Sequence, residues 1–212
     1  MLELNNIFKT FGGQTILNNV SLNIPRGARF GLIGGNATGK STLINIVTGF
    51  LKVEKGSILL DKIDLTNLKS WKFSKLGIKR TFQNCRMQPD ALLGDQLKFF
   101  KGSERALENM IISSGLSSHL NKFPSQIPLP LIRKAEVVRA LICKPKFLFL
   151  DEPSAGLSEE ELEQFATFLI NYVPFDTGLL IVEHREMLMS RITEKVFLLN
   201  NGQIELVKKA IC

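Results

Sequence analysis

The sequence predicts an α/β fold with a mainly parallel sheet, and three features of its pattern indicate this class. Short segments rich in β-branched and aromatic residues alternate with amphipathic segments along most of the chain. An Asn-Gly step separates two apolar runs near the C-terminus. Between Asn84 and Pro130 the pattern becomes polar and helical. We therefore expect a parallel sheet, an antiparallel piece that closes the domain, and an inserted helical lobe.

The parallel part is expected from strands and helices that follow one another in order. Strands are predicted at residues 29–33, 146–150 and 178–182, because these runs are short and rich in residues that favour strands. Helices are predicted at residues 40–48 and 160–172, which are amphipathic. An order of this kind is typical of a sheet with parallel strands.

The hairpin and the insertion are predicted from turn and breaker residues. Residues 196–199 and 203–207 flank Asn200-Asn201-Gly202, which favours an antiparallel hairpin. Within the insertion, residues 103–113 are expected to form a helix, and several prolines follow it. These prolines are Pro124, Pro128 and Pro130. The chain shows no repeat and no Pro-, Gly- or Ser-rich linker, so we expect one domain over residues 1–212.

Composition excludes several classes of protein. With 212 residues, of which 44% are apolar, the chain can bury one sizeable core. Its apolar runs are far shorter than the roughly 18 to 20 residues that a membrane-spanning helix needs. The first residues, Met1-Leu2-Glu3-Leu4-Asn5, lack the basic and apolar regions of an export signal. We expect a protein of the cytoplasm that does not span a membrane.

Cysteine spacing and net charge indicate no metal cluster and no nucleic-acid surface. Cys85, Cys143 and Cys212 lie far apart and form no C-x-x-C pair, so neither a zinc site nor a disulfide framework is expected. The formal net charge is +7, but the lysines are scattered along the chain. A nucleic-acid surface should gather its basic residues on one face, so a solvated exterior is the favoured interpretation.

A phosphate-binding loop is predicted between the first expected parallel strand and its helix. Residues 34–41 match G-x-x-x-x-G-K-[S/T], whose glycines let backbone N–H groups point at phosphate oxygens. Lys40 would bind the β and γ phosphates, and the hydroxyl of Ser41 would bind Mg²⁺. The alternative is a glycine-rich turn without a ligand. The expected nucleotide-binding residues here are Gly34, Gly35, Asn36, Ala37, Thr38, Gly39, Lys40, Ser41 and Thr42.

A pair of carboxylates follows the apolar strand at residues 147–150. Phosphoryl transfer needs a metal ion opposite the phosphates and a group that orients the attacking water. We expect Asp151 to hold Mg²⁺ and Glu152 to lie next to the water. Asp151 could instead cap the next helix, but Pro153 and the later Ser158 indicate that this helix begins further on.

These motifs, together with further short segments in the same order, resemble the ATP-binding cassette family over nearly the whole chain. Residues 80–84 resemble the Q-loop, 154–157 the D-loop that crosses a dimer interface, and 181–184 the switch segment. The resemblance implies that Gln83 reaches the metal ion and that His184 contacts the γ-phosphate. It also implies that Phe11 stacks on adenine, although Phe11 could be a plain core residue.

The resemblance implies a fold, an activity and partners. It implies a P-loop NTPase (RecA-like) core with an antiparallel β subdomain at residues 1–83 and 135–212, and a shortened helical lobe at 84–134. The expected cofactors are ATP and Mg²⁺, and the expected reaction is ATP hydrolysis coupled to transport through separate integral membrane permease subunits. The expected location is the cytoplasmic side of the inner or plasma membrane. The sequences at residues 81–84 and 48–50 are similar to those in cassettes of branched-chain amino acid, amide and urea importers.

The signature motif is where the sequence departs from the family. The family has Leu-Ser-Gly-Gly-Gln before a helix, whereas residues 127–131 read Ile-Pro-Leu-Pro-Leu, and residues 133–141 resemble the helix that follows. Pro128 and Pro130 lack the N–H groups that the motif donates to the γ-phosphate held by the other subunit. Ala37 also stands where the family usually has glycine. We therefore expect a heterodimer with a second, intact cassette rather than a homodimer.

Two other functions stay open on the sequence alone. A regulatory module that binds ATP but hardly hydrolyses it is favoured by the altered signature. A soluble cassette that acts on DNA or ribosomes would fit the basic charge, although such relatives usually carry a second cassette or a long coiled-coil insertion.

Overall fold

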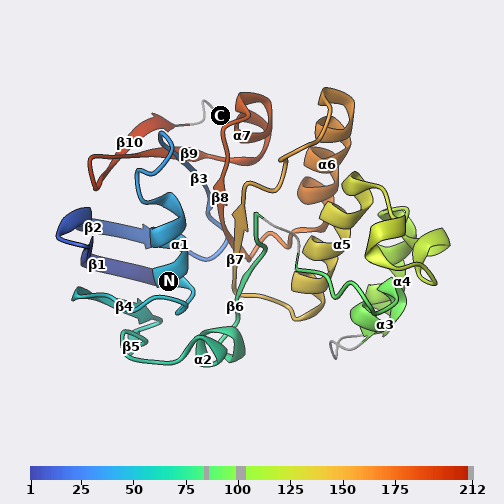
Figure 1. The fold of residues 1–212 in the computed structure, drawn as a ribbon, viewed down its shortest axis with the longest axis horizontal. Coiled ribbons are helices and arrows are strands. Elements are labelled where there is room, and N and C mark those ends of the chain that lie inside the picture. The colour runs from blue at the N-terminus through green and yellow to red at the C-terminus, as the bar shows by residue number, and fades with distance from the viewer. Residues whose placement is uncertain (84–85, 99–103, 210–212) are drawn as a thin grey trace.

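The predicted α/β class is confirmed. The computed structural model describes residues 1–83, 86–98 and 104–209, and they form two sheets with helices around them (Figure 1). The larger sheet has the strand order β10-β9-β3-β8-β7-β6. Its strands are β3 (Arg29–Ile33), β6 (Ile78–Arg80), β7 (Phe147–Asp151), β8 (Gly178–Val182), β9 (Lys195–Asn200) and β10 (Gln203–Lys209). All neighbours are parallel except β9 and β10.

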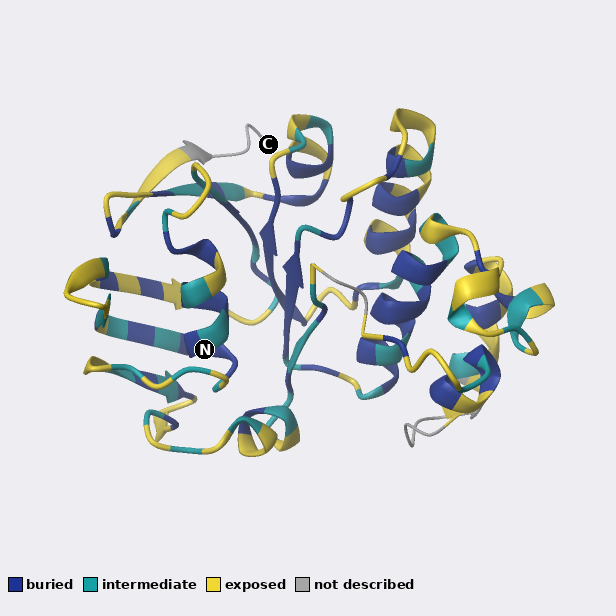
Figure 2. Cartoon of the chain, viewed as in Figure 1, coloured by how far each residue is buried: buried dark blue, intermediate teal, exposed yellow. Residues whose placement is uncertain are grey.

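The central strands are buried on both faces, as the apolar sequences of β7 and β8 require. Their side chains alternate between two cores. Phe147 and Phe149 of β7 pack into the core shared with the antiparallel sheet, whereas Leu148 and Leu150 pack into the core under the helices. Figure 2 shows these strands as the continuous buried centre of the molecule. These two central strands therefore leave only their ends open to solvent, and the edge where the parallel strands end is available for a site.

The C-terminal hairpin is confirmed at the predicted turn. Gln203 pairs with Asn200, which leaves Asn201 and Gly202 as a two-residue loop. Their φ angles are 47° and 73°, and an Asn-Gly pair adopts such left-handed angles readily. Asn18 donates from its backbone N to the Gly202 carbonyl at 2.7 Å, so the hairpin tip is tied to the second sheet.

The second sheet is antiparallel and lies beside helix α1 (Figure 1). Its order is β2-β1-β4-β5. The strands are β1 (Leu2–Phe11), β2 (Gln14–Ile24), β4 (Lys55–Leu60) and β5 (Ile63–Asp64). In β2 the buried residues Leu22 and Ile24 alternate with exposed ones, because one face of the sheet packs on α1 and the other meets solvent.

Helices cover the larger sheet and extend it to one side. The α-helices are α1 (Lys40–Val47), α2 (Ser70–Lys75), α3 (Leu93–Lys98), α4 (Glu104–Ser113), α5 (Leu129–Ile142), α6 (Glu159–Tyr172) and α7 (Glu186–Ile192). Short 3-10 turns lie at Ser117–His119 and Pro124–Gln126. In Figure 1, α5 and α6 lie next to the sheet, and α3 and α4 lie beyond α5. Within the described residues, no helix is long and apolar enough to cross a membrane.

The predicted helices are confirmed with small shifts at their ends. Ser158 caps α6 and accepts a bond from the N–H of Glu161, whose own carboxylate accepts from the N–H of Ser158. This capping box excludes Asp151 as the cap of that helix. The helix expected at residues 103–113 is α4, although Ser103 lies outside the described residues.

Helix α5 contains the segment that resembles the signature helix and extends it at its start. The segment at residues 133–141 that resembles the signature helix is helical as expected, and α5 begins four residues earlier, at Leu129. Pro128 is its N-cap and Pro130 lies in its first turn, where proline is tolerated because the N–H groups there have no intrahelical acceptor. The altered signature is therefore part of a regular helix start.

Candidate functional site

The glycine-rich loop connects the end of β3 to the start of α1, as predicted. Gly34 has a φ of 156°, and a Cβ there would lie 2.4 Å from the carbonyl oxygen of Leu199 in β9. Gly39 has a φ of 104°, and its Cβ would lie 2.9 Å from a methyl group of Ile16 in β2. Both positions thus require glycine, since a side chain would collide with a neighbouring strand. The loop is held between the two sheets.

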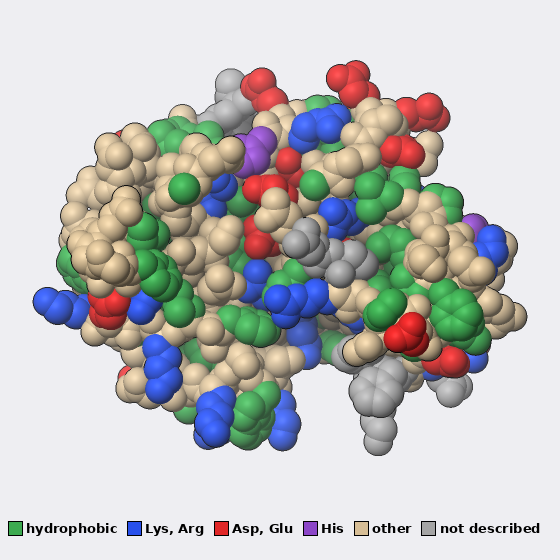
Figure 3. Space-filling model, in the orientation of Figure 1, with side chains coloured by type: hydrophobic (Ala, Val, Ile, Leu, Met, Phe, Trp, Pro, Cys, Tyr) green, Lys and Arg blue, Asp and Glu red, His purple; other side chains and the backbone are tan. Residues whose placement is uncertain are grey.

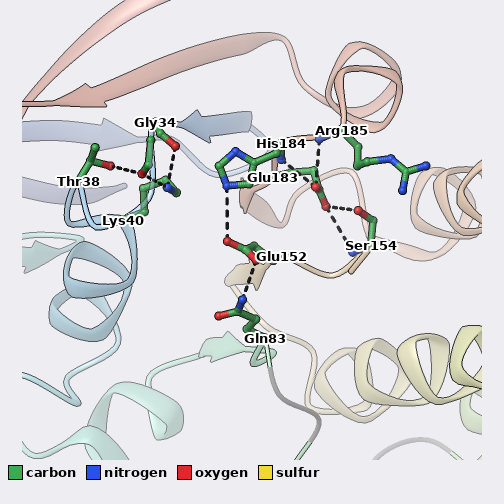
Figure 4. Close-up of polar contacts among 10 residues, drawn as sticks. Gly34, Thr38, Lys40, Gln83, Glu152, Ser154, Glu183, His184 and Arg185 are labelled. Carbon is green, nitrogen blue, oxygen red and sulfur yellow. Dashed lines mark hydrogen bonds and ion pairs between the residues drawn. The ribbon is translucent and has the colours of Figure 1, made fainter. Parts of the chain in front are cut away.

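Lys40 lies inside this loop with its charge toward the backbone carbonyls. Its Nζ donates to the carbonyl oxygens of Gly34 at 2.8 Å and Gly35 at 2.7 Å (Figure 4). Only 6% of the residue is exposed. Burial lowers the pKa of Lys40, and the nearby carboxylates of Glu152 and Asp151 oppose this shift. A buried cation beside free N–H groups at a helix start is an arrangement that binds phosphate.

A pocket of about 330 Å³ opens beside the loop. This volume is within the usual range for ligand sites. The pocket combines loop residues with one residue each from β1 and β2 and one each after β6 and β7. Its lining is Phe11, Ile16, Asn36, Ala37, Thr38, Gly39, Lys40, Ser41, Thr42, Gln83 and Glu152. Of the predicted site residues, Gly34, Gly35, Asp151 and His184 lie outside this lining. Ile16 is a wall of the pocket that the sequence interpretation missed, because nothing in its pattern sets it apart from a core strand residue.

Ala37 carries backbone strain that the motif alone does not reveal. Its φ is 61°, which is the left-handed region that costs a residue with a Cβ roughly 1 to 2 kcal/mol. The other positive φ angles in the loop at residues 34–41 fall on Gly34 and Gly39. Alanine at this position, where the family usually has glycine, therefore lowers the stability of the loop.

The two predicted carboxylates lie at the carboxyl end of β7 and face different partners. Asp151 is buried and accepts from Nη2 of Arg80 at 3.2 Å. Burial raises the pKa of Asp151, and the charge of Arg80 opposes this shift. Glu152 has a φ of 45°, and strained angles of this kind are concentrated at functional sites.

Gln83, Glu152 and His184 are brought together, as Figure 4 shows. Nε2 of Gln83 donates to Oε2 of Glu152 at 2.8 Å. Nε2 of His184 lies 3.6 Å from Oε1 of the same carboxylate. The three side chains follow β6, β7 and β8, which are neighbours in the sheet, so the parallel topology gathers them at one edge. Figure 3 shows acidic and basic side chains and a histidine in the upper middle of this face.

Phe11 lies at the end of β1, at the opposite wall of the pocket. It is 48% exposed, so it is no core residue, and Nζ of Lys9 lies 5.2 Å from the centre of its ring. Lys9 and Thr10 are in turn bound by Glu54. The ring is therefore held at the pocket rim with one face available for stacking.

Two charged residues that the sequence interpretation missed connect the site to its surroundings. Arg80 binds Asp151 and also donates to Oδ1 of Asn45 in α1 at 2.7 Å. Its guanidinium lies 4.2 Å from the ring centre of Phe82. Glu183 is 3% exposed and accepts hydrogen bonds from two separate loops. Both residues lie within the segments 80–84 and 181–184, but the sequence interpretation gave them no role. The apolar strand β8 directly before Glu183 was a signal for a buried charge there, whereas Arg80 ends the short strand β6 and had no such signal.

The altered signature segment contacts the D-loop of its own chain. A Cβ on Gly156 would lie 2.7 Å from Cδ2 of Leu129, and Nη2 of Arg133 is 3.5 Å from the carbonyl oxygen of Ala155. Pro128 and Leu129 are exposed on the surface. The prolines thus leave the shape of the helix start intact while they remove two backbone donors from it.

Comparison with known proteins places these features in a family. A family model described as ABC transporter matches residues 17–155, which is more than half of the chain. LivG of Salmonella typhimurium, a high-affinity branched-chain amino acid transport ATP-binding protein, is 30% identical over 228 residues, covering 95% of this chain and 89% of that protein. BraF of Pseudomonas aeruginosa, with the same description, is 26% identical, covering 95% of this chain and 89% of BraF.

Solved structures agree with the fold. A nucleotide-free ATP-binding cassette from an ABC transporter is 26% identical and has a TM-score of 0.87, covering 99% of this chain and 91% of that chain. A dimeric cassette in a post-hydrolysis state, bound to ADP and Pi, is 23% identical with a TM-score of 0.86 and full coverage of both chains, a likeness of fold alone. The loop, the carboxylates at the sheet edge and the matched family model together show that this chain belongs to the ABC transporter family and is an ATP-binding cassette that hydrolyses ATP.

Proposed function

We propose that the chain powers the import of branched-chain amino acids or a related solute through separate membrane permease subunits. This cargo is supported by the relatives LivG and BraF, which are described as branched-chain amino acid transport ATP-binding proteins, and by the sequence Thr81-Phe82-Gln83-Asn84. The working location would be the cytoplasmic face of the inner or plasma membrane. Residues 1–83 and 135–212 would form the nucleotide-binding core and residues 84–134 the helical lobe, with α5 continuing across that boundary.

The lining of the pocket fits a nucleoside triphosphate by its chemistry, with a buried lysine for the phosphates and an aromatic ring for the base. Phe11 would stack on the base, and the loop at residues 34–42 would bind the phosphates, with Lys40 supplying the positive charge. The observation that carries the proposal is that one pocket combines this buried lysine with Gln83 and Glu152 on the opposite side. Phosphate and a reaction centre would then lie between them.

The residues around the pocket also fit a magnesium ion. Ser41 has an exposed hydroxyl, Gln83 an exposed amide and Asp151 a carboxylate at the same strand edge, and all three are oxygen donors that a hard cation prefers. The described residues contain no group of three or more His, Cys, Asp or Glu side chains that could enclose a metal. Mg²⁺ commonly shares its coordination between a few protein oxygens, phosphates and water, and it would neutralise the charge that develops on the phosphates.

Glu152 would orient the attacking water, and His184 would contact the γ-phosphate. The hydrogen bond from Gln83 and the proximity of His184 hold the Glu152 carboxylate at the sheet edge. A carboxylate fixed in this way needs little reorganisation at the moment of reaction. Its strained backbone is consistent with a position constrained by function.

The altered signature favours a heterodimer. A signature motif donates to the nucleotide of the opposite subunit, and Pro128 and Pro130 remove two donors from this chain's motif. Loss of one donor to developing charge costs about 3 kcal/mol in a reaction barrier. A partner cassette with an intact motif would complete the site at Lys40 and Glu152, whereas two copies of this chain would have two impaired sites.

The proposal is tested by ATP turnover in the membrane complex reconstituted with its permease and partner cassette. The Glu152→Gln variant should bind Mg-ATP with unchanged affinity and lose turnover at this site, because Gln cannot accept a proton from water. A Glu160→Gln variant on the exposed side of α6 is the matched control and should keep full activity. Equal turnover in the wild type and the Glu152→Gln complex would instead favour the regulatory module that binds ATP without hydrolysing it.

A further inference from the structure

Glu183 joins two loops that lie far apart in the sequence. Its Oε2 accepts from the hydroxyl of Ser154 at 2.5 Å and from the N–H of Ser154 at 3.3 Å. Its Oε1 accepts from the N–H of His184 at 2.8 Å and of Arg185 at 3.1 Å. Figure 4 shows this carboxylate between the loop after β7 and the loop after β8. One buried side chain therefore receives four hydrogen bonds, two from each loop.

The burial of this carboxylate makes these bonds mutually dependent. An ionised carboxylate that is 3% exposed is stable only while its lone pairs are satisfied. Hydrogen bonds to a charged acceptor are shorter and stronger than those between neutral groups. Both carboxylate oxygens are bonded to the same carbon. Displacement of Ser154 must therefore rotate the Glu183 carboxylate and weaken its hydrogen bonds to the N–H groups of His184 and Arg185.

A second contact ties the same two loops together. Nη1 of Arg185 donates to the carbonyl oxygen of Leu157 at 3.1 Å. The loop at residues 154–157 also contacts the start of α5, through Leu129 against Gly156. The chain of contacts thus runs from the altered signature segment, through this loop and Glu183, to the backbone of His184.

We infer that Glu183 is a positioning residue, which fastens the loop at residues 154–157 to the backbone of His184. Movement of that loop then shifts the imidazole, whose Nε2 lies 3.6 Å from Oε1 of Glu152. The consequence for ATP hydrolysis rests on the proposed function, but the mechanical link does not. The link gives the dimer-facing surface of this chain a physical route to its own hydrolytic site.

The link is tested by amide hydrogen exchange on the full chain without nucleotide. Ser154→Ala removes the 2.5 Å hydrogen bond while it leaves the backbone donor in place. We expect the amides of His184 and Arg185 to exchange faster by on the order of tenfold, because bonds to charged groups are worth about this factor or more. Ser158→Ala is the matched control, since its hydroxyl caps α6 and does not contact Glu183. It should leave those two amides unchanged.

Two outcomes of the exchange experiment would overturn the inference. One is faster exchange in Ser154→Ala that stays confined to residues 154–157. The other is equal acceleration of the His184 amide in both serine variants, which would mean general loosening of the loop. Neither result depends on ATP binding, so failure of the link is distinguishable from failure of the proposed function.

A second variant gives a readout that a purely structural role would not change. Glu183→Gln replaces one acceptor oxygen by an NH₂ group, so one loop must detach. If the variant folds, its affinity for Mg-ATP should equal that of the wild type, because the loop at residues 34–42 is untouched, whereas turnover in the complex should fall at least tenfold. If it does not fold, the Ser154→Ala variant decides by the same comparison. A loss of affinity in proportion to turnover in the variant used would contradict a positioning role.

Discussion

Nη2 of Arg80 lies 3.2 Å from Oδ2 of Asp151, and both side chains are less than a tenth exposed. Burial lowers the pKa of Arg80 and raises the pKa of Asp151, in each case against the attraction of the partner. Desolvation therefore outweighs the attraction within the pair. The pair fixes the direction of the Asp151 carboxylate rather than adding stability of its own.

Removal of Arg80 alone should be costly. Arg80→Met leaves Asp151 buried without its cation, and the free energy of unfolding should fall by about 3 to 5 kcal/mol. Urea denaturation at neutral pH measures this loss. The double variant Arg80→Met/Asp151→Asn should recover part of it, because no unpaired charge then remains. Arg26→Met, which removes an exposed pair with Asp176, is the control and should cost less than about 1 kcal/mol. Equal losses for the two arginines would contradict this account.

Lys40 should reduce the stability of the ligand-free chain while it binds nucleotide. Because burial lowers its pKa in the folded state, the unfolded chain holds the proton more tightly. The free energy of unfolding should therefore rise as the pH increases from the lowered pKa toward the ordinary value of 10.5. This gain in stability is lost again as the pH falls back through the lowered pKa. Lys40→Met should unfold at higher urea than the wild type at pH 7, show a smaller rise at alkaline pH, and fail to bind ATP. A less stable variant with intact ATP binding would contradict the assignment.

Ala37→Gly should stabilise the loop. The left-handed angle at this position costs alanine roughly 1 to 2 kcal/mol, and glycine removes this cost. Glycine also makes the unfolded chain more flexible, which offsets about half of the stabilisation. We expect a net gain of about 0.5 to 1 kcal/mol in the free energy of unfolding, measured by urea denaturation. Ala37→Val should destabilise, since a β-branched residue tolerates this angle poorly. A loss of stability in the glycine variant would mean that the angle at residue 37 is not strained.

Phe11 should contribute to nucleotide affinity by stacking. An aromatic pair is worth about 0.5 to 1.5 kcal/mol beyond its buried area, so Phe11→Ala should weaken ATP binding by up to about tenfold. Phe11→Trp should retain the affinity. Phe175→Ala is the control, because Phe175 is 88% exposed in a loop that does not line the pocket. Titration calorimetry compares the three. Unchanged affinity in Phe11→Ala would show that the base lies elsewhere.

The strands and the loop motif could be predicted because each depends on local pattern. The apolar runs that became β3, β7 and β8 could hardly lie anywhere but in a buried sheet, and the Asn201-Gly202 turn follows from the angles these residues tolerate. Pairing of the antiparallel strands depends on contacts distant in sequence, so β1, β2, β4 and β5 were expected only through the family resemblance. Local pattern alone did not locate them.

Side-chain partners were beyond the reach of the sequence. Gln83, Glu152 and His184 were each singled out by motif, but their contact arises from the order of three strands. Arg80 and Glu183 were given no role, although they lie within the segments 80–84 and 181–184, because charged side chains are more often solvated than buried. Only the packing around them reveals that each connects the site to a second segment.

The most direct test of the account is the mass of the Glu152→Gln variant in solution, measured by light scattering with and without Mg-ATP. Blocked hydrolysis should trap any closed dimer that the chain can form. We expect the variant to bind ATP and stay monomeric, and to form a stable pair with nucleotide only when a cassette with an intact signature is added. A doubling of mass with Mg-ATP alone would show that Pro128 and Pro130 support a homodimer, and the heterodimer proposal would be wrong.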